Sequence, residues 1–429
     1  MAEASTIPKN VASEPRPSVR SLLLSAEVDG RLLGLIAALV VIWIGFDIMS
    51  GGLFLTPRNL WNLSVQSASV AIMATGMVLI IVSRNIDLSV GSVLTFTGMT
   101  MAMLQTQWLP QALLGQPYTW IIVLGLGLLL GATVGAIQGF IIAYLGVPSF
   151  IVTLGGLLIW AGLAFEEASG QTISPLDSTF QLLGGGPTGS VGEIASWAVG
   201  ALACVGIVYS LIASRRRRRR YGFPVRPKWA EGSLMIVSVV VVLGAVWVAN
   251  SYDWPEALAA QYGKGPNTPV GIANPVLMAI GVAIIMTIVA TRRRFGRYVF
   301  AIGGNPEAAL LVGIPVRRVT IKLFLLLAVM VTVASVVAVA RLNAGTNSLG
   351  TNMELYVIAA AVIGGVALSG GSGTVLGSML GALMIQFLES GLLLMDVSIG
   401  SRMVIIGQVL IVAVVFDVVY RRYTGERLA

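Results

Sequence analysis

Apolar residues in this chain gather in long runs that short polar segments separate. About twelve of these runs approach or reach the length of about 20 residues that a helix needs to cross a bilayer. They lie near residues 32–49, 60–82, 88–105, 119–144, 149–166, 192–213, 233–250, 273–291, 320–340, 355–369, 374–395 and 402–419. The pattern predicts an all-α polytopic membrane protein with about 10–12 transmembrane helices, because backbone groups in lipid must find partners within the protein.

Three of the runs are short or interrupted by glycine, namely 88–105, 355–369 and 374–395. We interpret them as broken half-helices, which many transporters contain. Because paired half-helices leave the number of crossings even, they do not change the predicted side of either chain end.

The composition supports a membrane location. Hydrophobic residues make up 56% of the chain and charged residues 11%, with a mean hydropathy of +0.89, whereas soluble domains carry about 25% charged residues. We divide the chain into a polar N-terminal tail, 1–31, a single transmembrane domain, 32–420, and a C-terminal tail, 421–429. The first apolar run lacks a small-residue cleavage site, so we interpret it as a span and not as a removed signal peptide.

Basic residues concentrate in segments that alternate with the spans on one side. With the N-terminus in the cytosol, all but four of the 27 basic residues lie in cytosolic segments. The exceptions are Arg58, Lys264, Arg341 and Arg402. The positive-inside rule therefore predicts an even number of spans and two cytosolic termini. Within the arginine-rich insertion 214–232, we interpret the run 215–220 as an anchor against anionic headgroups, with a regulatory site as the alternative.

Several kinds of chemistry are missing from the sequence. Histidine is absent and Cys204 is the only cysteine, which excludes an internal disulfide and a thiolate metal cluster. No stretch matches the phosphate-binding motif G-x-x-x-x-G-K-[ST], and the glycine-rich residues 371–377 lack its lysine. We therefore expect no cofactor, metal or ATP site on this chain.

The polar loop 292–319 contains the signature of a very short helix. Asn305 is a good N-cap, Pro306 suits the first helical position, and Glu307 lies at the positive end of the helix dipole. Gly313 and Pro315 would end the helix. An isolated helix this short is unstable in water, so its apolar face needs a partner. The candidate contact residues are Gly303, Gly304, Asn305, Pro306, Glu307, Ala308, Ala309, Gly313, Ile314 and Pro315.

Few polar side chains lie inside the spans. The candidates for lining a translocation path are Asn62, Gln66, Gln138 and Gln386. Uncharged amides suit a polyol better than a proton or a metal ion, although hydrogen bonding between helices is the simpler role for each. Glu389 is the exception, and it lies close enough to the outer end of its span to reach water. Asp87 is expected to cap the helix that runs on through Val93, a structural role, with a place in the path as the alternative.

Two glycine triplets predict tight helix packing. Gly131, Gly135 and Gly139 share one helical face, and so do Gly373, Gly377 and Gly381. Their places in different halves of the chain hint at an internal repeat.

Three segments, taken together, resemble a known family. Residues 85–92 read NIDLSVGS, residues 303–309 read GGNPEAA before Gly313 and Ile314, and residues 359–377 read AAAVIGGVALSGGSGTVLG. In this order they resemble motifs of the ribose/xylose-type ABC sugar importer permeases, and the arginine-rich insertion with the wording GGNPEAA is most similar to the xylose branch. Arg84 and Asn85 depart from the family, which often has small residues there.

The resemblance implies the permease subunit of an ATP-driven importer for a monosaccharide, D-xylose first, in the bacterial inner membrane. It also implies a homodimer with one path between the subunits, an extracytoplasmic sugar-binding protein, and a cytosolic ABC ATPase that carries the ATP and magnesium. Nucleic acid is not an expected partner. The segment 303–315 would be the coupling helix that the ATPase receives in a groove, so Ala309→Asp should uncouple the two proteins. Tyr252, Trp254 and Tyr262 are expected contacts of the binding protein, or headgroup anchors.

Two other functions stay open at this point. A stand-alone secondary sugar carrier or facilitator would leave the loop helix without a purpose. A membrane enzyme acting on lipid-linked substrates would call for clustered carboxylates or histidines, which the sequence lacks.

Overall fold

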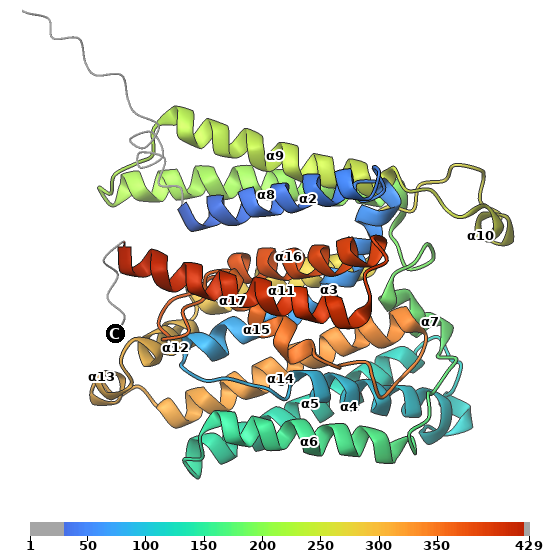
Figure 1. The fold of residues 1–429 in the computed structure, drawn as a ribbon, viewed down its shortest axis with the longest axis horizontal. Helices are drawn as coiled ribbons and strands as arrows, with labels where there is room; N and C mark the ends of the chain where they lie inside the picture. Colours follow the sequence, from blue (N-terminus) through green and yellow to red (C-terminus); the bar gives the residue numbers. More distant parts are fainter. Residues whose placement is uncertain (1–29, 424–429) are drawn as a thin grey trace, which may run out of the picture.

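Figure 1 shows a computed structural model of the chain, which describes residues 30–423. Within this range the regular structure is helical, and β contacts are limited to isolated bridges between loops. The longer helices run roughly parallel to one another along a common axis. The predicted tail 1–31, apart from its last two residues, and residues 424–429 of the predicted C-terminal tail lie outside the described range.

The helices are α2 (Gly30–Met49), α3 (Pro57–Val82), α4 (Val90–Met103), α5 (Thr119–Tyr144), α6 (Ser149–Glu167), α7 (Ser178–Gln181), α8 (Gly192–Arg220), α9 (Lys228–Asn250), α10 (Glu256–Gln261), α11 (Asn274–Arg292), α12 (Arg294–Gly304), α13 (Pro306–Leu311), α14 (Val316–Leu342), α15 (Met353–Ile363), α16 (Val375–Leu394) and α17 (Ile399–Tyr423). A π-helical turn, Leu104–Trp108, extends α4.

Each predicted apolar run contains a helix, which confirms the all-α polytopic fold. Among the described residues, eight helices are long and apolar enough to cross a membrane: α3, α5, α6, α8, α9, α11, α14 and α16. Shorter apolar helices lie at Leu33–Met49, Met353–Ile363 and Ile399–Val412. In Figure 1 the start of α2 and the end of α17 lie at the same end of the bundle as α12 and α13, as an even number of crossings requires. The side of the membrane that this end faces stays a prediction.

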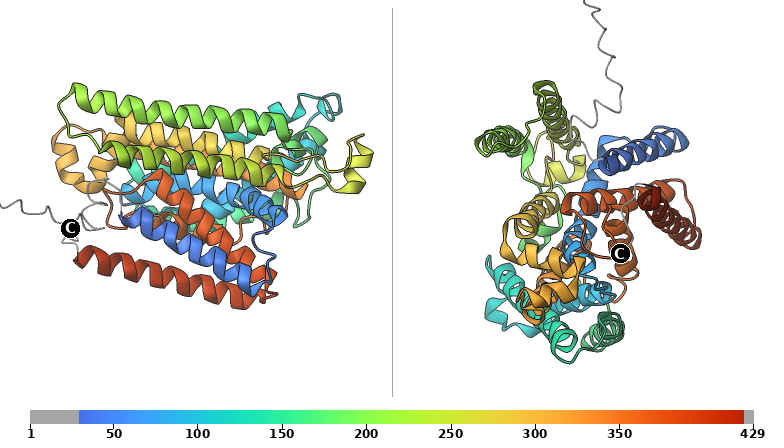
Figure 2. Two further views of the ribbon diagram at one scale, coloured as in Figure 1. Left: turned by 90° about the horizontal axis from the view of Figure 1, so that it is seen from above. Right: turned by 90° about the vertical axis from the view of Figure 1, so that its left-hand side faces the viewer.

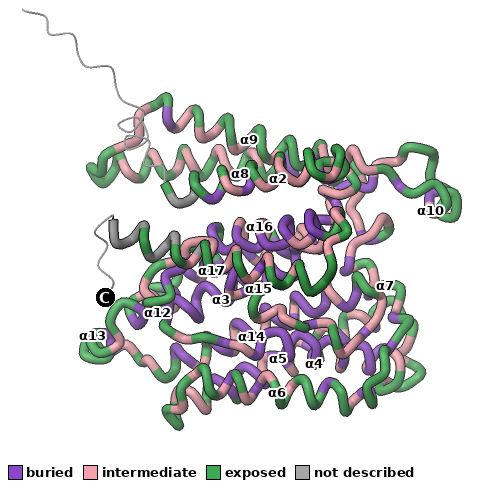
Figure 3. Tube along the Cα trace, in the orientation of Figure 1, coloured by how far each residue is buried: buried purple, intermediate pink, exposed green. Residues whose placement is uncertain are grey.

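Helix α3 forms the centre of the bundle. Within the protein, 94% of the apolar 18-residue stretch of α3 is buried, compared with 67% for the corresponding stretches of α14 and α16. Figure 3 shows the buried residues concentrated in these central helices and in α4. From Ser67 to Val82 every residue of α3 is buried, and its polar side chains there are small hydroxyls. A helix of this kind, apolar all round, is stable only when other helices surround it.

Helices α8 and α9 form a peripheral hairpin. Only 11% of the apolar 18-residue stretch of α8 and 6% of that of α9 are buried in the protein. The end view in Figure 2 shows the pair projecting from the body of the bundle. The arginine run, predicted as part of a loop at 214–232, instead continues α8 as far as Arg220, and α9 begins at Lys228. Arginine is a good helix former and a cation is favoured at a helix C-terminus, so the run extends the helix.

One of the three predicted half-helices is confirmed as a short helix, α15, whose 11 residues correspond to about 16 Å. Helix α4 has 14 residues, but the π-helical turn continues it without a break to Trp108, so its being a half-helix stays a prediction. Non-helical segments, 83–89 and 364–374, precede α4 and follow α15. The third prediction is wrong, because α16 runs unbroken over 20 residues. Its glycines lie inside the helix and serve in packing, which their spacing alone does not distinguish from a break.

The glycine triplets provide close helix contacts. A Cβ atom added to Gly135 of α5 would lie 2.5 Å from the carbonyl oxygen of Phe324 in α14. A Cβ atom added to Gly377 of α16 would lie 2.1 Å from the Gly364 carbonyl oxygen, just after α15. One added to Gly381 would lie 2.0 Å from the Ala360 carbonyl oxygen within α15. Gly373 precedes α16, which begins at Val375, so the second triplet does not share one helical face as predicted.

Candidate functional site

The short helix predicted in the polar loop is present as α13. The Asn305 side chain caps it by accepting a hydrogen bond from the Ala308 amide at 3.0 Å. Pro306 and Glu307 occupy its first turn. Gly313 follows the helix with a φ of +81°, a conformation that glycine adopts easily. The predicted cap, first turn and stop are confirmed.

The two faces of α13 have different surroundings. Ala309 is 3% exposed and belongs to the main core cluster, against which Ile314 also packs. Leu310, Leu311 and Val312 are 60%, 88% and 76% exposed. The apolar surface that is open to a partner therefore lies at the end of α13. The test expected at Ala309 was wrongly placed, because a carboxylate buried there would destabilise the protein itself.

Helix α13 directly follows a second short helix, α12, which the sequence pattern did not predict. The residues that α12 buries, Gly296, Val299, Ile302 and Gly303, lie along one face. Arg294 and Arg297 are exposed on the other side. The eleven residues of α12 begin at an arginine and end in two glycines, so in the sequence they look like part of a polar loop. Their apolar side is buried only by helices that are distant in the sequence.

The C-terminal end of α12 is fastened to the end of α3. Arg84, which follows α3, donates hydrogen bonds from Nε to the Gly303 carbonyl at 2.7 Å and from Nη2 to the Gly304 carbonyl at 2.9 Å. Carbonyls in the last turn of a helix lack intrahelical partners, and a cation is favoured beside them. The Gly371 amide donates to the Val82 carbonyl at 2.9 Å. We call this meeting point of Val82, Arg84, Gly303, Gly304, Gly370 and Gly371 the motif junction.

Close approach of backbones at the motif junction requires glycine. A Cβ atom added to Gly303 would lie 1.7 Å from the Val82 carbonyl oxygen and 2.7 Å from the Gly371 nitrogen. Gly370 has a φ of +87°, and a Cβ atom there would lie 2.5 Å from Cγ of Arg84. Gly304, by contrast, has no atom within 4 Å of such a position.

The motif junction joins residues of two segments that carry the family resemblance, 303–309 and 359–377, to Arg84, which directly precedes the third segment, 85–92. Arg84 is a residue that the sequence analysis did not assign a role. Its only signal was a departure from the small residues common at that position. Its partners lie 219 and 220 positions further along the chain, so no local pattern predicts the contact.

Two of the four candidate path amides lie together. Nε2 of Gln386 donates to Oε1 of Gln66 at 3.3 Å and lies 3.4 Å from Oε2 of Glu389, to which it also donates. Gln386 is buried and Gln66 is half-buried. Asn62 is half-buried one turn before Gln66 on α3. Helices α3 and α16 thus share a short polar strip within an apolar bundle.

Glu389 extends this strip and is only half-buried. The charges of Arg402 in α17 and Arg341 in α14 lie within electrostatic range of its carboxylate. Both arginines are among the four basic residues that did not follow the positive-inside pattern. Both therefore lie near an acidic side chain of α16.

Gln138, the fourth amide, belongs to a different cluster with Asp87. Nε2 of Gln138 donates to Oγ of Ser89 at 2.9 Å, and Asp87 accepts hydrogen bonds from the amide and the hydroxyl of Ser89. The prediction that Asp87 caps α4 is wrong, because the helix begins at Val90 and its N-cap is Ser89. Asp87 instead stabilises the turn before the helix through Ser89, and Gln138 bonds to the same residue.

The loop 251–272 packs against the start of α3. Trp254 is buried with Trp61 and Val270, and Nε1 of Trp61 donates to the Gly271 carbonyl at 2.8 Å. Trp254 is therefore part of a small core and not a surface contact as expected. Tyr262 is 55% exposed and stays a candidate contact.

Comparison with known proteins decides the family. Residues 59–414 match the family model described as the permease component of a branched-chain amino acid transport system. The chain belongs to this permease family. The permease is 36% identical over 388 residues to the xylose transport system permease protein of Escherichia coli strain K12, which covers 90% of this chain and 92% of that protein.

Two further relatives are similar over comparable lengths. The permease is 35% identical to the xylose transport system permease protein of Haemophilus influenzae, over 89% of this chain and 95% of that protein. It is 30% identical to the ribose import permease protein of Escherichia coli strain K12, over 89% of this chain and 92% of that protein. No solved structure matches the chain. These relationships confirm the resemblance inferred from the three segments, and they identify a multi-pass component of a transport system.

Proposed function

We propose that the permease is the membrane-spanning subunit of an ATP-driven monosaccharide importer in the bacterial inner membrane, with D-xylose as its substrate. The higher identity to xylose system permeases, 36% against 30% for the ribose import permease, supports this sugar. In this proposal two copies form a dimer around one path. A separate cytosolic ABC ATPase drives it, and an extracytoplasmic binding protein delivers the sugar.

The observation that carries the proposal is the exposed end of α13. Three consecutive apolar residues, 310–312, are open to solvent in the last turn and at the C-cap of a helix of six residues. Monomeric proteins rarely leave such a projection uncovered unless it binds a partner. In this proposal the projection enters a groove of the ATPase, and the remainder of α13 rests on the permease through Ala309.

The motif junction supplies a route from α13 to the centre of the bundle. A movement of α13 reaches the end of α12, which Arg84 and Val82 join to α3. The same movement reaches Gly371, in the segment that leads into α16. Packed helices transmit displacement because their interiors are dense. In this proposal α3 and α16 therefore shift relative to each other when the ATPase closes.

The amide pair lies between these two helices and has the chemistry to bind a sugar. A side-chain amide both donates and accepts hydrogen bonds, as a sugar hydroxyl does. When no sugar is present, Gln386 and Gln66 satisfy each other, so neither amide is left buried without a partner. A relative shift of α3 and α16 would separate them and expose both amides to the substrate.

Replacing Gln386 with leucine is expected to lower xylose uptake per folded molecule by about tenfold, the effect of losing about 1.4 kcal/mol of substrate interaction. The stability loss should be small, since a hydrogen bond between membrane helices contributes about 0.6 kcal/mol. Uptake into proteoliposomes and thermal unfolding measure the two effects. Gln138→Leu is the matched control, because Gln138 bonds to Ser89 in the other cluster. Equal uptake by both variants would refute the proposal that the amide pair binds the sugar in the translocation path.

The whole proposal is tested by gentle purification of the permease from its native membrane. We expect an ABC ATPase and a sugar-binding protein to co-purify, both identified by mass spectrometry, with xylose bound to the latter. A binding protein loaded with another sugar would refute D-xylose as the substrate but would still support the importer function.

A stand-alone secondary carrier is the competing function, and Glu389 is the observation in its favour. A carboxylate inside a span is typical of ion-coupled transport. Here, however, the charges of Arg341 and Arg402 attract its carboxylate, which gives Glu389 a structural role without ion coupling. Recovery of an active permease without an ATPase, with uptake that an ionophore abolishes at constant ATP, would establish the carrier instead.

A further inference from the structure

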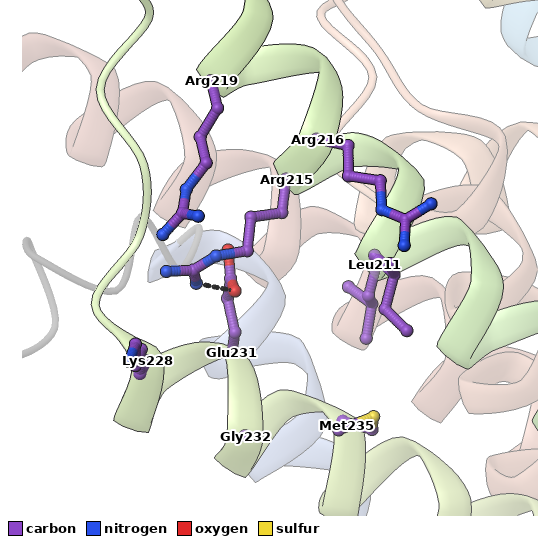
Figure 4. Close-up of a pocket in the computed structure, with 9 residues that line it drawn as sticks. Leu211, Arg215, Arg216, Arg219, Lys228, Glu231, Gly232 and Met235 are labelled. Carbon is purple, nitrogen blue, oxygen red and sulfur yellow. Dashed lines mark hydrogen bonds and ion pairs between the residues drawn. The ribbon is translucent and has the colours of Figure 1, made fainter.

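The end of the α8–α9 hairpin contains an open pocket of about 480 Å³. Arg215, Arg216 and Arg219 from the last turns of α8 line it together with Lys228 from the start of α9. Figure 4 shows Arg215 and Arg219 reaching from α8 toward the start of α9, while Arg216 lies on the other side, near Leu211. Neither the transport path nor the motif junction includes these residues.

The charges in this pocket do not balance. Glu231 is the one carboxylate in the lining, and it forms an ion pair with Arg215. Arg219 and Lys228 face the same space without a second carboxylate in the lining. Arg215 and Arg219 are one helical turn apart, a spacing at which like charges repel. An anion placed between the two helices would remove this repulsion.

The other part of the pocket is apolar. Leu211, Ile212 and Met235 line it on the side of the membrane-spanning parts of α8 and α9. Those parts are almost entirely unburied by the protein, so lipid would surround the hairpin. Tyr221, Phe223 and Trp229 are exposed close to the same turn, as aromatic residues are at the headgroup level of a membrane.

We propose that this pocket binds one anionic phospholipid. Its phosphate lies between Arg215, Arg219 and Lys228, and its acyl chain follows the surface formed by Leu211 and Met235. An amphipathic pocket at headgroup depth matches a lipid better than a free anion, which would leave the apolar part empty. The arginine run thus has two kinds of residue: those that line a specific site, and those, such as Arg217 and Arg220, that only add charge to the surface.

The test is native mass spectrometry of the full-length permease in micelles that contain equal amounts of phosphatidylglycerol and phosphatidylcholine. We expect one phosphatidylglycerol to be retained by the wild type. The double variant Arg219→Gln/Lys228→Gln should bind it about 25-fold more weakly, because each of the two basic residues near an anionic surface contributes about fivefold. Glu231→Gln should bind it more tightly, since the change removes the competing carboxylate.

The matched control is Arg217→Gln/Arg220→Gln, which removes the same number of charges from the same end of the hairpin, in the last turn of α8, without altering the pocket lining. This control should retain phosphatidylglycerol as the wild type does. A loss of about 25-fold in the control as well would show general surface attraction and overturn the proposal. Equal retention of phosphatidylcholine would show an apolar groove only. Displacement of the lipid by inorganic phosphate would show a site for a soluble anion, and either result would also overturn it.

Discussion

Leu311→Asp is expected to abolish ATP-driven xylose uptake while the permease inserts and folds normally. Leu311 is 88% exposed at the end of α13, so a carboxylate there should change the stability of the permease by less than about 0.5 kcal/mol. In the groove of an ATPase the same carboxylate would lose its hydration. Loss of one central contact of an interface costs about 2 kcal/mol or more, which is roughly thirtyfold in affinity.

Uptake into cells and the amount of ATPase that co-purifies with the variant measure this effect. Leu311→Met should keep both near the wild-type level, because methionine fills a similar volume in an apolar groove. Leu342→Asp places the same charge on an exposed leucine at the end of α14, far from α13, and should retain the ATPase. Wild-type uptake by Leu311→Asp would refute the role of α13 in coupling.

Gly303→Ala is expected to have the largest effect on the permease itself. The added Cβ atom would lie 1.7 Å from the Val82 carbonyl oxygen, and both partners are backbone, so α12 must separate from α3. Overpacking of this kind costs about 1–3 kcal/mol or more. The shift would also lengthen the hydrogen bonds from Arg84 and Gly371 and disconnect α13 from the bundle. We expect reduced thermal stability together with loss of uptake per folded molecule.

The adjacent residue provides the control for this prediction. Gly304→Ala introduces the same methyl group where no atom lies within 4 Å, and alanine suits a helix better than glycine. Stability and uptake of that variant should match the wild type. If Gly303→Ala and Gly304→Ala behaved alike, the close contact between α12 and α3 would not be needed for function.

Features that depend on neighbours in the chain could be predicted from the sequence. Lipid allows no unpaired backbone, so apolar runs of sufficient length had to become helices, and each predicted run contains one. The α13 helix is set by residues within one turn of each other, because the Asn305 cap and the Gly313 stop act over three to five positions. The three segments of the family resemblance are likewise visible in the order of the residues.

The tertiary structure decided every feature that depends on packing between distant segments. Helix α12 became a helix because the bundle buries one of its faces, and the exposed end of α13 was distinguished from Ala309 in the same way. Arg84 found carbonyl partners more than 200 positions away. Of the four amides that the sequence offered as candidates for the path, only Gln66 and Gln386 form a hydrogen bond with each other, whereas Gln138 donates one to Ser89. Local pattern determines where apolar runs and capped segments become helices, because caps and apolar runs act over a few residues. The contacts that connect the elements arise only when the folded chain fills its interior at close-packed density.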